Sequence, residues 1–303
     1  MAQPQEALLE TLDQSLSAAV SAIAPSVLRL ERGHGGGTAL AWTEELAVTS
    51  NFHCPDRTAV LVPSGDDAGE LEEREAMIVG RDRGLDLALL KVTGGGLRAP
   101  ALRTGEPIAV GNLAIAVGRP GRSVRASLRM IGVVGRGVRT PAGGTLDEYV
   151  ETDRLIPRGF AGGPLIDARG RVIGVNTRTL LRGHDLAVTP GVLELSVAEL
   201  VQHGGVRRGY LGVGVTAVEL SRSLAAARGR ARGAMVSALE DDGPAERAGV
   251  QQGDILVSLD GAAIDGPRAL RDAIAERPGA AVELELARAG ALQKLAVTLG
   301  ARP

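Results

Sequence analysis

Aromatic residues and cysteines are scarce in this chain of 303 residues, and neither sign of charge is in large excess. Phe, Trp and Tyr make up 2% of the chain, so Val, Leu, Ile and Ala must fill the core. The single cysteine, Cys54, cannot form a disulfide within the chain, and stability must therefore come from packing. The net charge of -2 gives no broad attraction to nucleic acid or to an anionic membrane.

Basic residues are missing from the N-terminal segment, because residues 1–28 contain no Lys or Arg. A secretory signal peptide starts with a basic segment, and the apolar run 16–24 is too short to span a bilayer. We therefore expect a cytoplasmic protein with no membrane partner, although an exported mature form restarted at Met1 would look the same. Apolar residues at helical spacing before Pro25 predict an amphipathic helix over residues 5–23, packed on the first domain.

Glycine, by contrast, is abundant at 42 residues and separates short apolar or alternating runs between Val27 and Thr179. Such runs are typical of antiparallel β-barrels. The acidic stretch 65–75 is expected to be a solvated loop. The glycines at 35–37 are expected to form a tight hairpin, because no Lys-Ser or Lys-Thr follows them as in a phosphate loop. A helix is predicted between a start at Thr189 and an end at Gly204.

Three short motifs combine the residue types that amide hydrolysis requires. They are Ser50-Asn51-Phe52-His53-Cys54, then Asp86-Leu87-Ala88-Leu89-Leu90-Lys91, and then Gly159-Phe160-Ala161-Gly162-Gly163-Pro164-Leu165. A histidine can act as general base, an aspartate can hold it in one tautomer, and a glycine-rich turn can aim N–H groups at an oxyanion. Each motif alone also has an ordinary structural interpretation, as a packed histidine, a buried strand or a turn. Their occurrence together, in this order, favours the catalytic interpretation.

The motifs resemble those of HtrA-type, trypsin-like serine proteases, which carry serine where this chain has Ala161. The resemblance implies a mostly β, chymotrypsin-like fold of two antiparallel β-barrels. It also implies that His53 is the general base, that Asp86 orients it, and that the N–H groups of Gly159 and Ala161 form an oxyanion hole. The residues expected to pair with a substrate strand are Asn176, Thr177 and Arg178.

Two further positions bear on which branch of these proteases the chain resembles. Phe160 stands where zymogen-activated trypsin-like enzymes carry an acid, which favours the HtrA branch. Leu155 and Ile156, just upstream, indicate an apolar specificity pocket.

Residues 207–303 resemble a PDZ domain, with matching strings at 208–213, 243–250 and 253–261. PDZ domains add a peptide strand to an open sheet edge and capture its C-terminal carboxylate with backbone amides. Leu270 and Ile274, four apart on a helix predicted at 267–276, either line this groove or belong to the core, and both interpretations stay open. The residues that the resemblance assigns to the carboxylate loop are Tyr210, Leu211, Gly212 and Val213.

We therefore expect a helical segment at 1–24, a protease domain at 25–203, a linker at 204–209 and a PDZ domain at 210–303. The first hypothesis is an ATP-independent serine endopeptidase of protein quality control that acts on unfolded or extended polypeptides. As given, it would be inactive, because Ala161 supplies no attacking oxygen. The alternative is a natural pseudoprotease that serves as a PDZ peptide-binding scaffold or as a holdase.

The expected partners are polypeptide substrates and, at the PDZ groove, C-terminal peptides. No metal or organic cofactor is implied, since the four histidines are scattered and no acidic cluster has the spacing of metal ligands. HtrA-type proteases often form trimers through aromatic N-terminal contacts, and residues 5–23 contain no aromatic side chain. A homo-oligomer therefore stays open, and a trimer is not specifically predicted.

Overall fold

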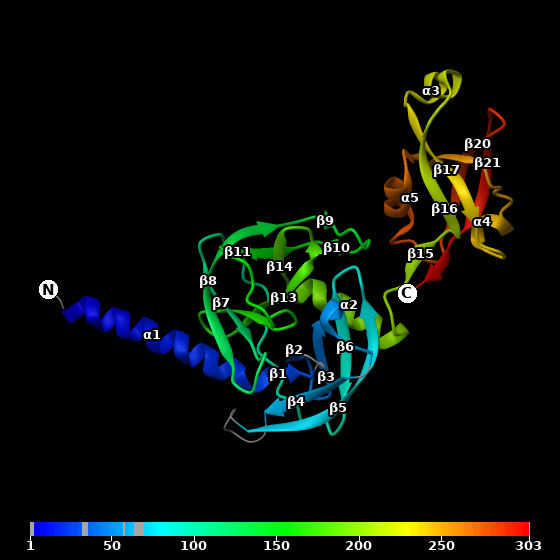
Figure 1. Cartoon of the computed structure of the whole chain (residues 1–303). Coiled ribbons are helices and arrows are strands. Elements are labelled where there is room, and N and C mark those ends of the chain that lie inside the picture. Colours follow the sequence, from blue (N-terminus) through cyan, green and yellow to red (C-terminus); the bar gives the residue numbers. More distant parts are fainter. Residues whose placement is uncertain (1–2, 32–35, 57, 64–69, 303) are drawn as a thin grey trace. The chain divides into compact units, whose positions relative to one another are not determined.

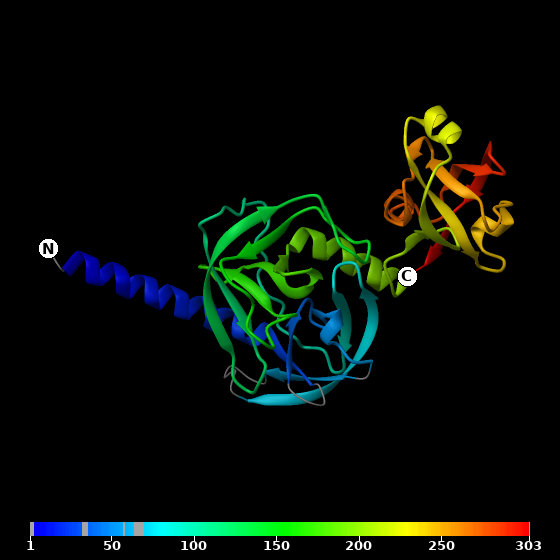
Figure 2. The ribbon, with the colours of Figure 1, turned by 45° about the horizontal axis from the view of Figure 1, so that its top comes forward.

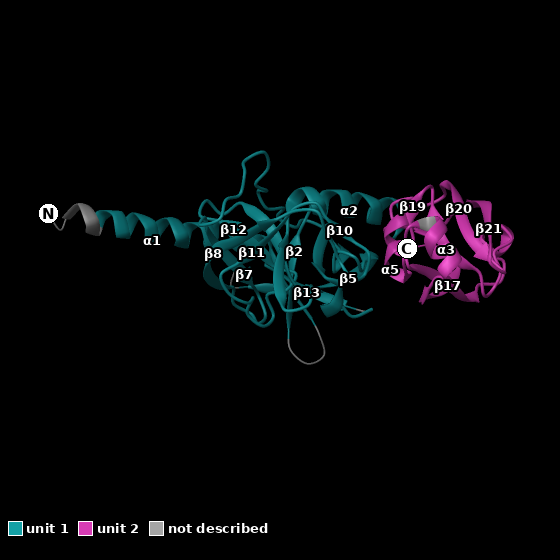
Figure 3. Ribbon diagram, turned by 90° about the horizontal axis from the view of Figure 1, so that it is seen from above, with its two compact units in different colours: residues 1–205 teal, residues 206–303 magenta. Residues whose placement is uncertain are grey.

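The computed structural model describes residues 3–31, 36–56, 58–63 and 70–302 (Figure 1). The chain divides into two compact units, residues 1–205 and residues 206–303 (Figure 3). Strands dominate both units, and the first contains two closed barrels, so the predicted mostly β, double-barrel fold class is confirmed. Residue 35 of the predicted glycine hairpin lies outside the described residues.

Helix α1 (Gln3–Ile23) opens the first unit and continues through a short 3-10 helix, η1 (Ala24–Ser26), into the first strand. Ala19 and Ile23, near its C-terminal end, are 4% and 2% exposed and pack on the unit. Leu8 and Leu9 are 69% and 66% exposed. The helix is therefore present as predicted, but only its last turns are packed. Among the described residues, no helix is both long and apolar enough to cross a membrane.

The first barrel closes in the order β1-β2-β3-β6-β5-β4, with a core of small and aliphatic side chains such as Leu28 and Leu90. Residues 65–69 of the acidic stretch expected to be a loop lie outside the described residues, and residues 71–75 are strand instead, because they pair with β4 in antiparallel register. The charged side chains there are mostly exposed to solvent, so the composition of this stretch indicated a loop although the chain forms a strand. The strands are β1 (Val27–Leu30), β2 (Gly37–Ala41), β3 (Leu46–Ser50), β4 (Thr58–Pro63), β5 (Leu71–Asp82) and β6 (Leu87–Val92).

The second barrel closes in the order β11-β14-β13-β12-β7-β8 and lies beside the first, as the green and blue-to-cyan strands of Figure 2 show. Aliphatic side chains again fill it, together with Phe160. A separate short pair, β9 (Val138–Arg139) and β10 (Thr145–Leu146), precedes β11. The barrel strands are β7 (Leu113–Gly118), β8 (Arg125–Gly135), β11 (Tyr149–Thr152), β12 (Pro164–Asp167), β13 (Val172–Leu181) and β14 (His184–Val188).

Helix α2 (Pro190–His203) follows the second barrel and ends at Gly204, whose φ of 69° is left-handed. Glycine adopts this conformation without steric cost, which explains the predicted stop. Thr189 is at the N-cap as expected, but its side chain does not cap the helix. Its hydroxyl donates instead to the C=O of Glu148 at 3.0 Å.

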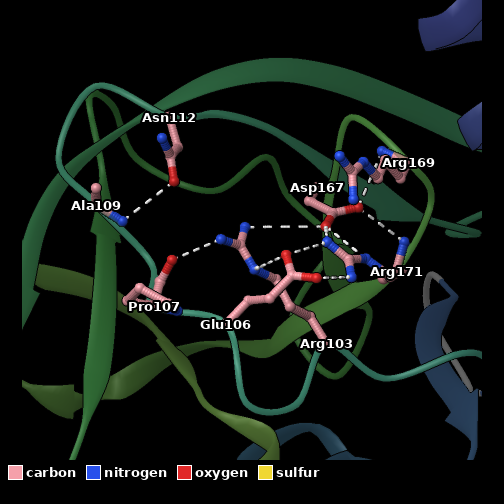
Figure 4. Close-up of polar contacts among 8 residues, drawn as sticks. All are labelled: Arg103, Glu106, Pro107, Ala109, Asn112, Asp167, Arg169 and Arg171. Carbon is pink, nitrogen blue, oxygen red and sulfur yellow. Dashed lines mark hydrogen bonds and ion pairs between the residues drawn. The ribbon is translucent and has the colours of Figure 1, made fainter.

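An ion-pair network fastens the β12–β13 hairpin to the loop before β7 (Figure 4). The two Nη atoms of Arg171 donate to the two carboxylate oxygens of Glu106 at 2.8 and 2.9 Å, and its Nε donates to Asp167 at 2.9 Å. The hydrogen bonds from Arg171 lower the pKa of Glu106 to about 2. This hairpin directly follows the 159–163 turn, so the network supports the segment that carries Ala161.

The second unit contains the sheet β16-β17-β18-β20-β21, with β19 paired to β18, and a separate pair of β15 with β22. Its core is aliphatic and includes Leu256, Leu284 and Leu286. Strand β16 is at one end of the sheet order, so one of its edges has no partner strand among the described residues. The elements are β15 (Arg208–Tyr210), β16 (Val213–Glu219), α3 (Arg222–Arg228), β17 (Arg232–Leu239), α4 (Pro244–Arg247), β18 (Ile255–Leu259), β19 (Ala262–Ala263), α5 (Pro267–Ile274), β20 (Ala281–Arg288), β21 (Ala291–Thr298) and β22 (Gly300–Arg302).

Candidate active site and peptide-binding unit

The carboxylate of Asp86 is held by both barrels, and the residue is only 5% exposed. Its Oδ1 accepts the backbone N–H of Phe52 at 2.8 Å, and its Oδ2 accepts the hydroxyl of Ser50 at 2.8 Å. Oδ2 also accepts the hydroxyl of Thr177, on β13 of the second barrel, at 2.6 Å. A buried carboxylate is costly unless donors surround it, and these three donors meet that need. They fix Asp86 beside the segment that carries His53.

His53 is the last residue of a 3-10 helix, η2 (Asn51–His53), which follows β3 directly. The N–H of Asn51 donates to the main-chain oxygen of Asp86 at 2.9 Å, so the backbone and the side chain of Asp86 both hold this helix. The imidazole is half-buried and meets the Phe52 ring edge-on, with 5.1 Å between the ring centroids. The structure therefore brings His53 and Asp86 into one polar neighbourhood.

The 159–163 turn is fixed against the first barrel near the end of β3. Gly162 has a φ of +84°, and a Cβ on it would lie 2.4 Å from the oxygen of Thr38 and 2.7 Å from the nitrogen of Ser50. Only glycine fits there. The hydroxyl of Thr38 donates to the C=O of Gly159 at 2.5 Å, which holds the other end of the turn. Ala161, between the two glycines, is 2% exposed.

The backbone of the turn leaves two amides available. Gly162 and Gly163 use their N–H groups for the oxygens of Asn176 and Phe160, at 2.8 and 2.9 Å. Within the described part of the chain, no acceptor takes the amide hydrogens of Gly159 and Ala161. Both residues predicted to supply an oxyanion hole thus have N–H groups that no acceptor among the described residues uses.

The three residues expected to pair with a substrate strand differ in their placement. Asn176 is not free to do so, because its N–H donates to Gly163 at 2.9 Å and its C=O accepts from Gly162. The Thr177 side chain holds Asp86, a contact between residues 91 apart that no local pattern reveals. The Nε of Arg178 lies 3.5 Å from the carboxylate of Asp185 on β14. The part of β13 left for a substrate therefore begins after Asn176.

The two residues predicted to form an apolar specificity pocket differ in exposure. Leu155 is 62% exposed, whereas Ile156 is 5% exposed and belongs to the core of the second barrel. The N–H of Ile156 donates to the Asp185 carboxylate at 2.6 Å. The apolar specificity pocket therefore stays a prediction, and of the two residues only Leu155 has a side chain exposed to a ligand.

The predicted carboxylate loop of the second unit lies between β15 and β16. Tyr210 ends β15 with its ring 3.8 Å from the guanidinium carbon of Arg302, and Val213 begins β16. Leu211 is 1% exposed and is part of the core. Gly212 has a φ of +78°, and its C=O accepts from the N–H of Glu240 at 3.0 Å. The loop is thus a fixed turn at the start of the sheet's open edge strand.

Leu270 and Ile274 both lie on α5, as predicted, and are 4% and 7% exposed. Both contribute to the hydrophobic core of the second unit, which favours the core interpretation that the sequence left open. Helix α5 approaches β16, since a Cβ on Gly266 would lie 3.4 Å from the Cβ of Ala217. Among the described residues, no group of His, Cys, Asp and Glu side chains could hold a metal ion.

Both units match families of known proteins. Residues 37–175 match the family model of the trypsin-like peptidase domain, and residues 209–299 match that of the PDZ domain. A probable periplasmic serine endoprotease, DegP-like, from Ectopseudomonas mendocina (strain ymp) is 34% identical over 84% of this chain. A protein of the same description from Brucella suis biovar 1 (strain 1330) is 30% identical over 90%. The chain spans about half the length of these curated relatives, 54% of each.

Solved structures agree with the sequence relatives. The HtrA-type protease AlgW with decapeptide is similar, with a TM-score of 0.68 and 28% identity, over 95% of this chain and 99% of that one. The names of the curated relatives also correct the expected location: they are called periplasmic, so the prediction of a cytoplasmic protein is wrong, and an exported one is indicated. The composition of residues 1–28 was therefore a poor guide to location. With a trypsin-like peptidase domain followed by a PDZ domain, the chain belongs to the HtrA/DegP-type family of serine endopeptidases.

Proposed function

We propose that this chain has the catalytic frame of a serine endopeptidase for unfolded or extended polypeptides, with the nucleophile replaced by Ala161. In this frame His53 is the general base and Asp86 holds it in the productive tautomer. The amides of Gly159 and Ala161 bind the oxyanion. A protease domain at 25–203 is followed by a linker at 204–209 and a PDZ domain at 210–303.

The observation that carries this proposal is the set of donors around the Asp86 carboxylate. Phe52 and Ser50 donate from the segment of the first barrel that carries His53, and Thr177 donates from the second barrel. If Asp86 were only an acid at the start of an ordinary buried strand, it would not need hydrogen-bond donors from both barrels next to a histidine. The arrangement suits an acid whose task is to orient that histidine where the 159–163 turn arrives.

The mechanism follows from these positions once a hydroxyl stands at 161. The base would take the hydroxyl proton while the oxygen attacks the substrate carbonyl, and it would then give that proton to the leaving amine. The carbonyl oxygen would move toward the two open amides, which stabilise its charge. With a methyl group at 161 no oxygen attacks, and related sites without their nucleophile retain only about 10³ to 10⁴-fold acceleration over water. As it stands, the chain should bind polypeptides and hardly cleave them.

The second unit supplies a peptide-binding edge in the same proposal. Strand β16 has no partner strand on one side among the described residues, and α5 lies next to it. A C-terminal peptide would add a strand to β16 and place its carboxylate at the turn of residues 210–213. The relative AlgW was solved with a decapeptide, which is compatible with peptide binding by this chain.

The proposal is tested by Ala161→Ser, assayed for casein cleavage and for labelling by a fluorophosphonate. Cleavage and labelling that disappear on further substitution of His53 by Ala are the expected result. Failure of the folded Ala161→Ser protein in both assays would defeat the proposal.

A second candidate is a natural pseudoprotease that serves as a peptide-binding scaffold or holdase, and Ala161 itself favours it. In that case alanine is encoded by the natural gene at codon 161, and the frame around it has been retained for binding. The sequence of the natural gene at codon 161 shows whether alanine is native there or was engineered. Suppression of aggregation of an unfolded protein by the unaltered chain would support the holdase function.

A further inference from the structure

Arg81, near the C-terminal end of β5, holds the chain on both sides of His53. Its guanidinium reaches main-chain and side-chain acceptors in residues 51–56, which include η2 and the turn after it. One planar group with several donors can hold such a segment in a single geometry. The acceptors are the Asn51 Oδ1 (2.8 Å) and C=O (3.4 Å), the Cys54 C=O (3.1 Å from each Nη), the Pro55 C=O (3.3 Å) and the Asp56 carboxylate (3.0 Å).

Asp82, the next residue, holds the turn that leads into Asp86. It is 3% exposed, and its Oδ1 accepts the N–H groups of Gly84 and Leu85 at 2.8 and 3.2 Å. Its Oδ2 accepts the hydroxyl of Ser196, on α2, at 2.8 Å. Arg81 and Asp82, adjacent on β5, thus form hydrogen bonds with the segments that carry the proposed base and the proposed acid.

Arg81 and its neighbour Gly80 also contact the end of the first unit. Arg81 pairs through its backbone with Gly205 in an isolated parallel bridge, and Gly205 is the last residue of that unit. The neighbouring Gly80 packs so closely that a Cβ on it would lie 2.4 Å from the oxygen of Gly204. Helix α2 and the residues after it are therefore in direct contact with the strand end that supports both loops.

We propose that Arg81 and Asp82 are positioning residues of the active site. Through their contacts with these two residues, α2 and Gly204–Gly205 would influence the positions of the His53 and Asp86 segments. This inference rests on the function proposed above. A displacement of α2 or of the two glycines would alter the support of both segments at once. The segment that leads to the second unit is thereby linked to the proposed base and acid within the first unit.

The alternative is that Arg81 only anchors the barrel, and the chain offers a matched control for that alternative. Arg74 lies on the same strand, its side chain is 22% exposed like that of Arg81, and it donates to the C=O of Gly95 and to Glu72. Its contacts involve neither the His53 nor the Asp86 segment. A general loss of barrel stability should follow from Arg74→Met as much as from Arg81→Met.

The first test uses hydrogen exchange in the chain as given, with Ala161 unchanged. Arg81→Met should speed amide exchange in residues 51–56 by about tenfold or more, the loss expected when several hydrogen bonds from a charged group are removed. Arg81→Lys should have a smaller effect, because a lysine keeps the charge and some donors. Asp82→Asn should speed exchange in residues 83–86. Equal exchange in residues 51–56 for Arg81→Met and Arg74→Met would overturn the inference.

The second test adds the same changes to Ala161→Ser and measures cleavage of labelled casein. Arg81→Met should lower kcat by about ten- to a hundredfold, because a small misplacement of a catalytic group has a large effect on rate. KM should change by less than about twofold, since the proposed contacts do not touch the substrate. Arg81→Lys should restore part of the kcat, and equal kcat in the Arg81→Met and Arg74→Met proteins would contradict the role. If Ala161→Ser itself is silent, the proposed function fails, and the exchange test still decides whether Arg81 holds the segment.

Discussion

Replacing Thr177 by valine tests the contact that joins the two barrels at the proposed acid. Valine keeps the β-branched shape but removes the hydroxyl that donates to the Asp86 Oδ2 at 2.6 Å. The carboxylate stays buried and keeps its bonds from Ser50 and Phe52. A hydrogen bond to a charged group contributes about 1.5–3 kcal/mol, so the free energy of unfolding of the first unit should fall by about 2 kcal/mol. For a unit of this size that corresponds to a decrease in Tm of about 4–8 °C.

Calorimetry of the full chain measures this change as a shift in the Tm of the transition that includes the first unit. Thr179→Val is the matched control, since Thr179 lies on the same strand, is exposed, and should change the stability by less than about 0.5 kcal/mol. A Tm for Thr177→Val equal to that of the control would show that the hydroxyl does not hold the carboxylate. The account of how the barrels share Asp86 would then be wrong.

Gly162→Ala should destabilise the first unit by more than about 2 kcal/mol in urea, because the new Cβ would lie 2.4 Å from a backbone oxygen of β2 at a φ of +84°. Gly191→Ala, where nothing lies within 4 Å, should be nearly neutral. The Arg171 hydrogen bonds lower the Glu106 pKa from 4.5 to about 2, so their stabilisation is complete above pH 4.5 and is lost as the pH falls toward 2. Glu106→Gln should therefore flatten the acid limb of the stability curve, and an unchanged limb would contradict the assignment. Leu270→Ala should lower the free energy of unfolding of the second unit by about 2–5 kcal/mol, because the side chain is buried in its core. A decrease below about 1 kcal/mol would favour the interpretation that Leu270 lines the peptide groove.

The barrels could be predicted because most of their strands are short apolar or alternating runs between glycine-rich turns. The exception is β5, whose N-terminal half contains several acids. Its pairing with β4 and β6 provides the backbone hydrogen bonds, while the charged side chains remain in water. Cross-strand pairing of this kind leaves no mark on local composition. The exposure of Leu8 and Leu9 on α1 was equally hidden, since helical spacing predicts an apolar face but not what covers it.

The candidate site could be predicted only as far as its motifs extend. His53, Asp86 and the 159–163 turn are found by their local sequence, and the structure brings their segments together. The hydroxyl of Thr177 and the guanidinium of Arg81 act across long stretches of sequence, so no local pattern indicates them. Asn176 was predicted to pair with a substrate strand, and no local pattern indicates that Gly162 and Gly163 form hydrogen bonds with its backbone.

The central claim is that the chain retains a working serine protease frame without its attacking oxygen. Mass spectrometry after fluorophosphonate treatment tests it most directly, on Ala161→Ser and on the same protein with His53→Ala. We predict one adduct, in the peptide that contains position 161, which forms only when His53 is present. An unlabelled Ala161→Ser protein that is folded, or labelling that persists without His53, would contradict the account.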